Sequence, residues 1–263
     1  YLNLEKRKEK EMNDLTLHCG AQKVLLSDLS KVPLPKETKT YKPVSHFDLV
    51  ANTTEMGDMF LQNQGYELES QNYALGRKGK HMFFNLNYKK LTTTGQDTTG
   101  LTIGGRNSYD KSTTIGIAVG MRVFICDNLA FSGDQVTYLR KHTGNVYEDL
   151  EVILMRTMKN ADTEFERMEY ESKGMKNISL TDNQAYRKLG VLFGNDILSP
   201  RQLPVVKKEW KKPTYDTFKE RNMWSFYNAC TEALKSSPPK DILTRHTKLH
   251  KMLCGRGGAG LVA

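Results

Sequence analysis

The spacing of apolar residues changes once along this chain, and that change limits the fold more than any other feature. Residues 66–77 and 81–89 alternate as strands do, and a tight turn at residues 78–80 joins them. From Val146 to about Ser172 apolar residues instead recur at steps of three and four, the period of a long amphipathic helix. Further strand-like segments lie between these regions, at residues 101–106, 113–126 and 136–140. Consecutive strands with short connections, followed by a long helix, predict an α+β fold in which that helix lies across an antiparallel sheet.

The flanking regions divide the chain into three parts. Residues 1–44 are rich in Lys and Glu and are interrupted by proline, so we expect an irregular, partly helical arm. Residues 45–200 form the expected α+β core, which opens with a helix from Ser45 to about Gln64. Residues 201–263 are expected to form a basic helical C-terminal region. We also expect a helix at 181–193, a lysine-rich linker at 199–215, and two last helices at 216–236 and 241–254.

The positive charge of the chain is concentrated near its C-terminal end. The formal net charge is +9, and residues 201–263 alone carry 13 Lys and Arg against 5 Asp and Glu. Residues 146–200 carry 7 basic against 10 acidic side chains. A concentrated basic field attracts polyanions, of which nucleic acid is the commonest inside cells. The alternative is a solvated surface that only keeps the protein in solution.

Composition also sets expectations for the compartment. No run of about 18 apolar residues occurs, so we expect no membrane contact through a spanning helix. The first residues lack the apolar segment of a signal peptide. The four cysteines are widely spaced and form no paired motif, which suits reduced thiols. These features favour a cytoplasmic protein.

Three groups of basic residues are candidates for contact with nucleic acid. The first combines four lysines with an aromatic ring, a pattern that suits single strands because charge follows the phosphates while the ring stacks on a base. The second surrounds the turn at residues 78–80, and the third precedes Asn145, where a helix start could accept a phosphate. Their members are Lys207, Lys208, Trp210, Lys211 and Lys212; Arg77, Lys78 and Lys80; and Arg140 and Lys141, next to His142.

Three other groups of residues are candidates for sites of chemistry. Oxygen-bearing side chains near the ends of the predicted strands are the ligands that Mg²⁺ prefers, but Asn and Asp in such places usually serve as turn residues. Cys126 and His142 form a nucleophile–base pair only if the fold brings them together. His246, His250 and Cys254 fall on one helical stripe, but a structural zinc site needs four ligands. The oxygen-bearing set is Asn107, Ser108, Asp110, Asp127, Asn128 and Asp134.

We therefore expect no cofactor and no metal, and the sequence contains none of the common nucleotide-binding or hydrolase motifs. An enzyme is the less favoured class.

A set of short motifs in the middle of the chain resembles a phage- and plasmid-type family of unknown function, the YfjQ-like proteins. The motifs are Arg106-Asn-Ser-Tyr-Asp-Lys-Ser112, Gly120-Met-Arg-Val-Phe-Ile-Cys-Asp-Asn128, Ser132-Gly-Asp134 and Lys141-His-Thr-Gly-Asn145. The chain departs from the family pattern at Tyr109, where the pattern has His, and at Lys111, where it has Gly. The resemblance implies a phage, prophage or plasmid context, and it implies no particular activity.

Three hypotheses about function follow, and the third and least favoured is a metal-dependent phosphoryl-transfer enzyme that uses Asp110, Asp127 and Asp134. The first is a mobile-element protein that binds nucleic acid, single-stranded DNA above all, or anneals it as a homo-oligomer. A sheet followed by a long helix and a basic groove is also the broad plan of phage annealing proteins, which is a fold-level analogy. The alternative is a protein-interaction module of a phage or plasmid, such as an inhibitor of a host defence component, which predicts an exposed apolar patch.

Overall fold

The strands of the protein form one antiparallel sheet. The structure is a computed structural model that describes residues 21–91, 99–123, 128–131, 137–238 and 241–254. Within these ranges seven strands pair in the order β1-β2-β3-β4-β5-β6, and β7 also pairs with β5. Their bounds are β1 Gln22–Val24, β2 Tyr66–Gly76, β3 His81–Lys90, β4 Thr99–Ser108, β5 Ile115–Val123, β6 Asn128–Phe131 and β7 Thr137–Arg140.

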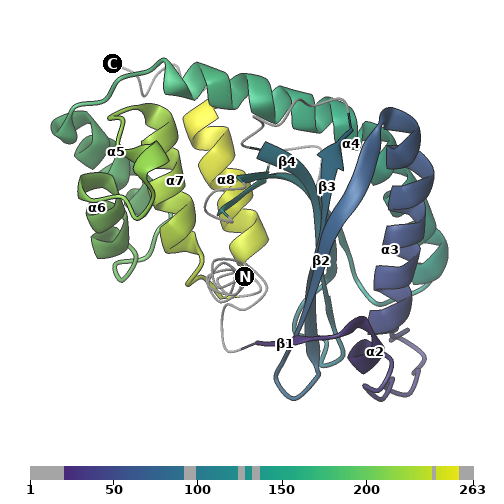
Figure 1. The fold of residues 1–263 in the computed structure, drawn as a ribbon. Helices are drawn as coiled ribbons and strands as arrows, with labels where there is room; N and C mark the ends of the chain where they lie inside the picture. The colour runs from purple at the N-terminus through teal and green to yellow at the C-terminus, as the bar shows by residue number, and fades with distance from the viewer. Residues whose placement is uncertain (1–20, 92–98, 124–127, 132–136, 239–240, 255–263) are drawn as a thin grey trace, which may run out of the picture.

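Helices pack against the sheet, and the C-terminal helices form a group beside it (Figure 1). The longest helix, α4, runs along the top of the view from α3 at one side to the group of α5, α6 and α7 at the other. The α+β fold with a long helix across an antiparallel sheet is thus confirmed. The helices are α2 Leu26–Leu29, α3 His46–Leu61, α4 Val146–Lys176, α5 Asp182–Gly194, α6 Leu203–Lys211, α7 Met223–Leu234 and α8 Ile242–Cys254, with 3₁₀ turns η2 Gln62–Gln64 and η3 Asp216–Phe218.

A single cluster of buried apolar side chains joins the sheet to the C-terminal helices. Phe84 and Ile103 of the sheet, Met158 of α4 and Tyr227 of α7 belong to the same cluster, and each is at most 2% exposed. The C-terminal helices therefore share the core of the sheet. Among the described residues, no helix is both long enough and apolar enough to cross a membrane.

The helix starts follow their capping residues. The hydroxyl of Ser45 accepts from the N–H of Asp48 at the start of α3, and Thr181 forms a reciprocal pair with Gln184 at the start of α5. Both starts agree with the sequence predictions. Gly65 ends the continuous helical segment of α3 and η2 in the left-handed conformation, with φ of 81°.

Two expectations for the C-terminal region were wrong. The expected linker at 199–215 contains α6, in which Pro204 occupies the first turn, where a helix tolerates proline. The expected helix at 216–236 starts only at Met223, where the side chain of Asn222 caps it. Strand β6 was also missed, because Asn128 was interpreted as a turn residue.

The register of β3 and β4 places an aromatic ring over a glycine. Phe84 pairs with Gly105, and a Cβ atom added at Gly105 would lie 2.2 Å from the Phe84 ring. Phe84 is 2% exposed, so its ring has little room to move. Only glycine fits at this position without displacing the core.

We expect Gly105→Ala to lower the free energy of unfolding by about 1–3 kcal/mol, the usual cost of overpacking a core. The matched control is Gly190→Ala in α5, where an added Cβ meets no atom within 4 Å. That control should raise stability by about 0.5–1 kcal/mol, because alanine favours a helix. Urea unfolding measures both, and an unchanged midpoint for Gly105→Ala would contradict the packing described.

Candidate nucleic-acid interface

Three turns that are far apart in sequence meet at one end of the sheet. The β2–β3 turn (residues 77–80) adjoins the β4–β5 turn (residues 109–114), because His81 pairs with Ser108. The β7–α4 turn (residues 141–145) joins them, because Ile115 pairs with Arg140. We call these three turns together the turn end; in Figure 1 the β2–β3 turn lies at the bottom of the sheet.

Tyr109 holds the turn end together through every polar group it has. Its backbone N–H donates to the carbonyl of Lys80 at 2.7 Å, and its carbonyl accepts from the Tyr41 hydroxyl at 3.3 Å. Its own hydroxyl accepts from the backbone N–H of His46 at 2.8 Å. The ring stacks on the His46 imidazole, with 3.7 Å between the centroids. Burial lowers the pKa of His46 to about 4, so the stacked imidazole is neutral near pH 7.

Basic side chains cover this end. Lys78, Lys80, Lys111 and Lys141 are all exposed. The ammonium group of Lys111 lies 4.5 Å from the centre of the Tyr41 ring, close enough for a cation–π contact. The fold thus gathers lysines from three separate segments onto one surface.

Two arginines near the turn end serve to brace it. Arg77 Nη1 lies 3.3 Å from Asp110 Oδ2, between two of the turns. Arg140 donates from Nε to Asp149 Oδ2 at 2.7 Å and from Nη2 to the Thr143 carbonyl at 3.0 Å. Of the five residues predicted at the second and third basic groups, Lys78, Lys80 and Lys141 therefore present the least compensated charge.

The Asp110 carboxylate is the acidic centre of the β4–β5 turn. Its oxygens lie 2.9 and 3.0 Å from His81 Nε2, and it accepts from the Ser112 N–H at 3.0 Å. The Ser112 hydroxyl lies 2.7 Å from the same Nε2 atom. A catalytic relay of Ser, His and Asp needs the two partners on different ring nitrogens, so this group is not one.

The oxygen-bearing side chains considered for Mg²⁺ are occupied by turn hydrogen bonds where the structure describes them. Asn107 Oδ1 accepts from the Ser108 N–H at 2.9 Å, and the Ser108 hydroxyl donates to the Thr113 carbonyl at 2.8 Å. Asp127 and Asp134 lie outside the described residues, as does Cys126, the nucleophile considered beside His142.

A pocket of about 310 Å³ opens between the β4–β5 and β7–α4 turns. Lys111 and Lys141 line it, together with Tyr41 and His142 and several hydroxyl side chains. His142 is 5% exposed and is thus a buried residue, although the sequence placed it beside a surface basic group.

The first basic group of the sequence analysis lies elsewhere, on α6 at the left of Figure 1 with α5 and α7. Trp210 is 3% exposed, and its indole N–H donates to Asp182 at 3.0 Å. Its face is covered by the Arg221 guanidinium, 4.8 Å from the ring centre. The ring is therefore a core anchor with no open face for a base, contrary to the stacking role expected. Lys211 is also engaged, in an ion pair with Asp182, whereas Lys207, Lys208 and Lys212 are exposed.

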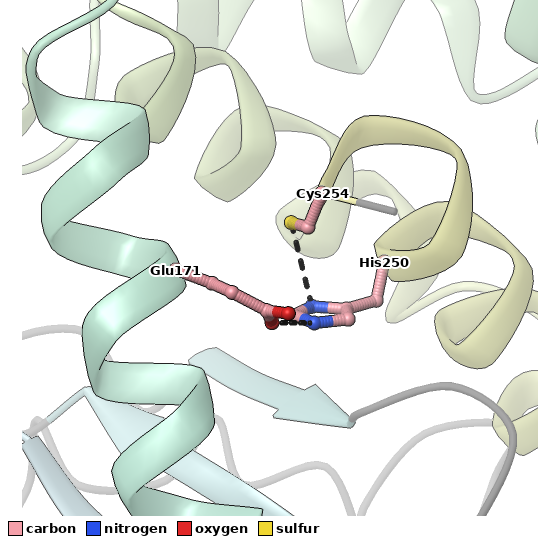
Figure 2. A group of neighbouring side chains, drawn as sticks. All are labelled: Glu171, His250 and Cys254. Carbon is pink, nitrogen blue, oxygen red and sulfur yellow. Dashed lines mark hydrogen bonds and ion pairs between the residues drawn. The ribbon is translucent and has the colours of Figure 1, made fainter. Parts of the chain in front are cut away.

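The predicted histidine stripe of α8 meets α4 (Figure 2). Glu171 lies 2.6 Å from Nε2 of His250, and the Cys254 sulfur lies 3.7 Å from Nδ1 on the other side of the ring. Burial raises the pKa of the Cys254 thiol, which keeps the sulfur protonated and a poor nucleophile. The three residues bring ligand atoms within 4.8 Å of one another, and three ligands are fewer than the four that a structural zinc site needs. We interpret the group as a buried polar tie between α4 and α8, and Glu171, 79 residues from His250, had no sequence signal.

The fold and this surface define an α+β protein with a basic turn end. A family model described as a domain of unknown function (DUF932) matches residues 33–252, and the chain belongs to that family. This confirms the expectation of a family of unknown function, and the whole turn end lies within the matched range. No curated protein and no solved structure matches the chain.

Asp110 should give the turn end a measurable acid dependence. Partial burial raises its pKa, but the hydrogen bonds from Ser112 and the neighbouring His81 outweigh burial and hold the pKa at about 2. A carboxyl whose pKa is lower in the folded state stabilises the fold above its ordinary pKa and loses that effect as the pH falls through the folded pKa. The lowering corresponds to on the order of 2 kcal/mol.

We therefore expect Asp110→Asn to lower the free energy of unfolding by that amount at pH 7. The difference from the wild type should shrink between about pH 4 and pH 2, where the wild-type carboxyl takes up its proton. Urea unfolding of both proteins across this range tests it. A difference that stays constant down to pH 2 would show that the Asp110 charge does not stabilise the turn.

Proposed function

We propose that this protein binds nucleic acid through the turn end, with single-stranded DNA as the favoured ligand. The observation that carries the proposal is the convergence of three basic turns on one surface. Lys78 and Lys80 come from the first turn, Lys111 from the second and Lys141 from the third. A surface assembled from several segments can follow successive phosphates along a backbone, which one cluster on one helix does less well.

The charges on this surface are available to a ligand. The local carboxylate, Asp110, is engaged with His81 and Arg77, and Asp149 is engaged with Arg140. The exposed lysines keep long flexible stems, which suit contact with a backbone whose sequence varies. Such binding depends on neutralising phosphates and weakens as salt rises.

The proposed ligand follows from the arrangement of the fold and not from a stacking ring. The preference for single strands rested on Trp210 as a stacking ring, and that ring is buried. Single-stranded DNA is the favoured ligand because of the fold-level analogy to annealing proteins. The same analogy suggests a homo-oligomer. The central motifs resemble those of a phage- and plasmid-type family, which agrees with a cytoplasmic protein of a phage or plasmid.

A second candidate function, protein interaction, is favoured by one observation. A groove of about 390 Å³ between α3 and α4 is lined by Met56, Met59 and Tyr147. Met59 and Tyr147 are more than half exposed, and Glu55, Glu148 and Glu151 line the same groove. Exposed apolar side chains gathered in this way are typical of a partner surface. Partner binding there would depend little on salt, which separates it from nucleic-acid binding.

The test compares two variants of equal charge. Lys78, Lys80 and Lys141 are changed to Glu in one, and Lys207, Lys208 and Lys212 of α6 in the other, so each lowers the net charge of +9 by six. We expect the turn-end variant to bind labelled single-stranded DNA at least tenfold more weakly than the wild type. Its slope of log affinity against log salt should fall by about 2, since each lost phosphate contact removes about 0.7 for single strands.

The α6 variant should bind within about threefold of the wild type, because its lysines lie outside the proposed surface. Equal losses in both variants would show that overall charge, and not the turn end, governs binding. Failure of the wild type to bind single- or double-stranded DNA or RNA at low salt would contradict the proposed function. Circular dichroism and unfolding curves of each variant establish that its fold is intact.

A further inference from the structure

The C-terminal ends of α4 and α8 each present a pair of side chains that can bind a metal. Glu171 and Met175 lie four residues apart on α4, and His250 and Cys254 lie four residues apart on α8. Residues at this spacing share one face of a helix. Figure 2 shows three of the four, with the His250 ring between Glu171 and Cys254. The histidine stripe of α8 alone has too few ligands for a metal, and α4 adds two.

Glu171 fixes the orientation of the His250 ring. Its carboxylate lies 2.6 Å from Nε2, so in the neutral ring this nitrogen carries the proton and donates to the carboxylate. The other nitrogen, Nδ1, then has a lone pair to offer. A histidine that donates to a carboxylate from one nitrogen and is unprotonated at the other is the usual arrangement of an imidazole that binds a metal. His250 is 4% exposed, so its neighbours hold the ring in this orientation.

The sulfur of Cys254 is close to two further donor atoms. It lies 3.7 Å from Nδ1 of His250 and 3.5 Å from Sδ of Met175. A metal bound at about 2.1 Å from nitrogen and about 2.3 Å from sulfur, at angles near tetrahedral, places nitrogen and sulfur about 3.6 Å apart and two sulfurs about 3.8 Å apart. The observed separations are close to these values, so a metal ion fits between the donor atoms with little movement of either helix.

The Tyr227 hydroxyl competes for the same nitrogen. It lies 3.3 Å from Nδ1 of His250, within reach of a hydrogen bond. Burial raises the pKa of Tyr227, so the hydroxyl stays protonated and donates to Nδ1. A metal bond to Nδ1 replaces this hydrogen bond and leaves a buried hydroxyl without its partner, which costs binding energy. Removal of the hydroxyl therefore has opposite effects on the polar tie and on metal binding.

The donor atoms select a soft cation. A thiolate and a thioether favour Cu(I), whereas Mg²⁺ and Ca²⁺ prefer oxygen ligands. Zn²⁺ binds thiolate, imidazole and carboxylate, so the thioether of Met175 distinguishes copper from zinc. Burial raises the pKa of the Cys254 thiol, but a thiol that coordinates a metal loses its proton. Cys254 is partly exposed at the end of α8, which gives an ion a path into the site.

We propose that Nδ1 of His250, Sγ of Cys254 and Sδ of Met175 bind one Cu(I) ion, with Glu171 as the residue that positions the imidazole. The ion takes the place of the thiol proton, which passes to solvent. It links α8 to α4 more firmly than the polar tie does. The inference is independent of nucleic-acid binding, because none of these residues belongs to the turn end.

The first experiment titrates the full chain with Cu(I) under nitrogen, with ascorbate present, in competition with a coloured Cu(I) chelator. We expect one ion per chain to be held against the chelator. Cys254→Ser and His250→Gln should each bind it at least tenfold more weakly. The matched control is Cys19→Ser, which removes a thiol that belongs to neither helix and should bind within about threefold of the wild type. Circular dichroism establishes that each variant is folded.

Variants of the two remaining residues test their separate roles. Met175→Leu keeps an apolar side chain of similar size but has no sulfur, so it should bind Cu(I) at least fivefold more weakly and leave any Zn²⁺ binding unchanged. Met252→Leu, a methionine of α8 outside the cluster, is its control and should bind Cu(I) as the wild type does. Glu171→Gln should weaken Cu(I) binding by about tenfold, the usual effect of losing the partner of a metal-binding histidine.

Tyr227→Phe separates a metal site from a purely structural tie. Without copper it should be less stable than the wild type in urea, because it loses one buried hydrogen bond, yet it should bind Cu(I) at least as tightly. X-ray absorption at the copper edge should show sulfur and nitrogen neighbours in the wild type. The proposal would be overturned by no Cu(I) binding in the wild type or by equal binding in Cys254→Ser. Zn²⁺ binding that Glu171→Gln abolishes and Met175→Leu leaves unchanged, without Cu(I) binding, would also overturn it.

Discussion

The turn end depends on the hydrogen bonds and stacking of Tyr109. This residue ties the β4–β5 turn to Lys80 of the β2–β3 turn and to Tyr41 and His46 of the segment that leads into α3. The third turn is held to the same segment through the bond between Lys42 and the His142 carbonyl. Residues 41–46 therefore contact both the β4–β5 turn and the β7–α4 turn and connect them. The lysines on the turns can be mobile at their tips because the backbone beneath them is fixed.

This arrangement separates two kinds of positive charge. Arg77 forms an ion pair with Asp110, and Arg140 forms one with Asp149. These two pairs hold the turns in place. The lysines around them remain directed to solvent. Arginine suits the bracing role because its planar group forms several directed bonds, and lysine suits contact with a mobile polyanion. The basic residues of α6 do not belong to this surface because α6 lies with α5 and α7, and there Lys211 and Arg221 are paired with Asp182.

The sequence predicted the local elements well and the site only in part. Ser45 and Thr181 marked helix starts because a cap acts within one turn of chain, and the spacing from Val146 onwards marked α4 for the same local reason. Helix α6 was missed because Pro204 was interpreted as a breaker, although Leu203, Val206 and Trp210 follow a helical spacing that signals a buried face. That spacing also accounts for the burial of Trp210.

The rest depended on contacts between distant segments. Lys80 and Tyr109 meet only because the register of β3 and β4 aligns their turns. Neither segment alone determines that register. His142 follows Arg140 and Lys141 and so looked like part of a charged surface, but the packing of residues 41–42 against it makes it a buried group. Tyr109, at which the chain departs from the family pattern, is the residue on which the turn end depends.

The most direct measurement of the central claim is photo-crosslinking of the protein to single-stranded DNA that contains 5-iododeoxyuridine, followed by identification of the crosslinked peptides. If the three turns form one nucleic-acid surface, crosslinks should concentrate in peptides that contain residues 77–80, 109–114 and 141–145. Excess unlabelled DNA should abolish them, and the peptide that contains α6 should remain unmodified. Crosslinks confined to α6 and the neighbouring C-terminal helices, with none in the turns, would contradict the account.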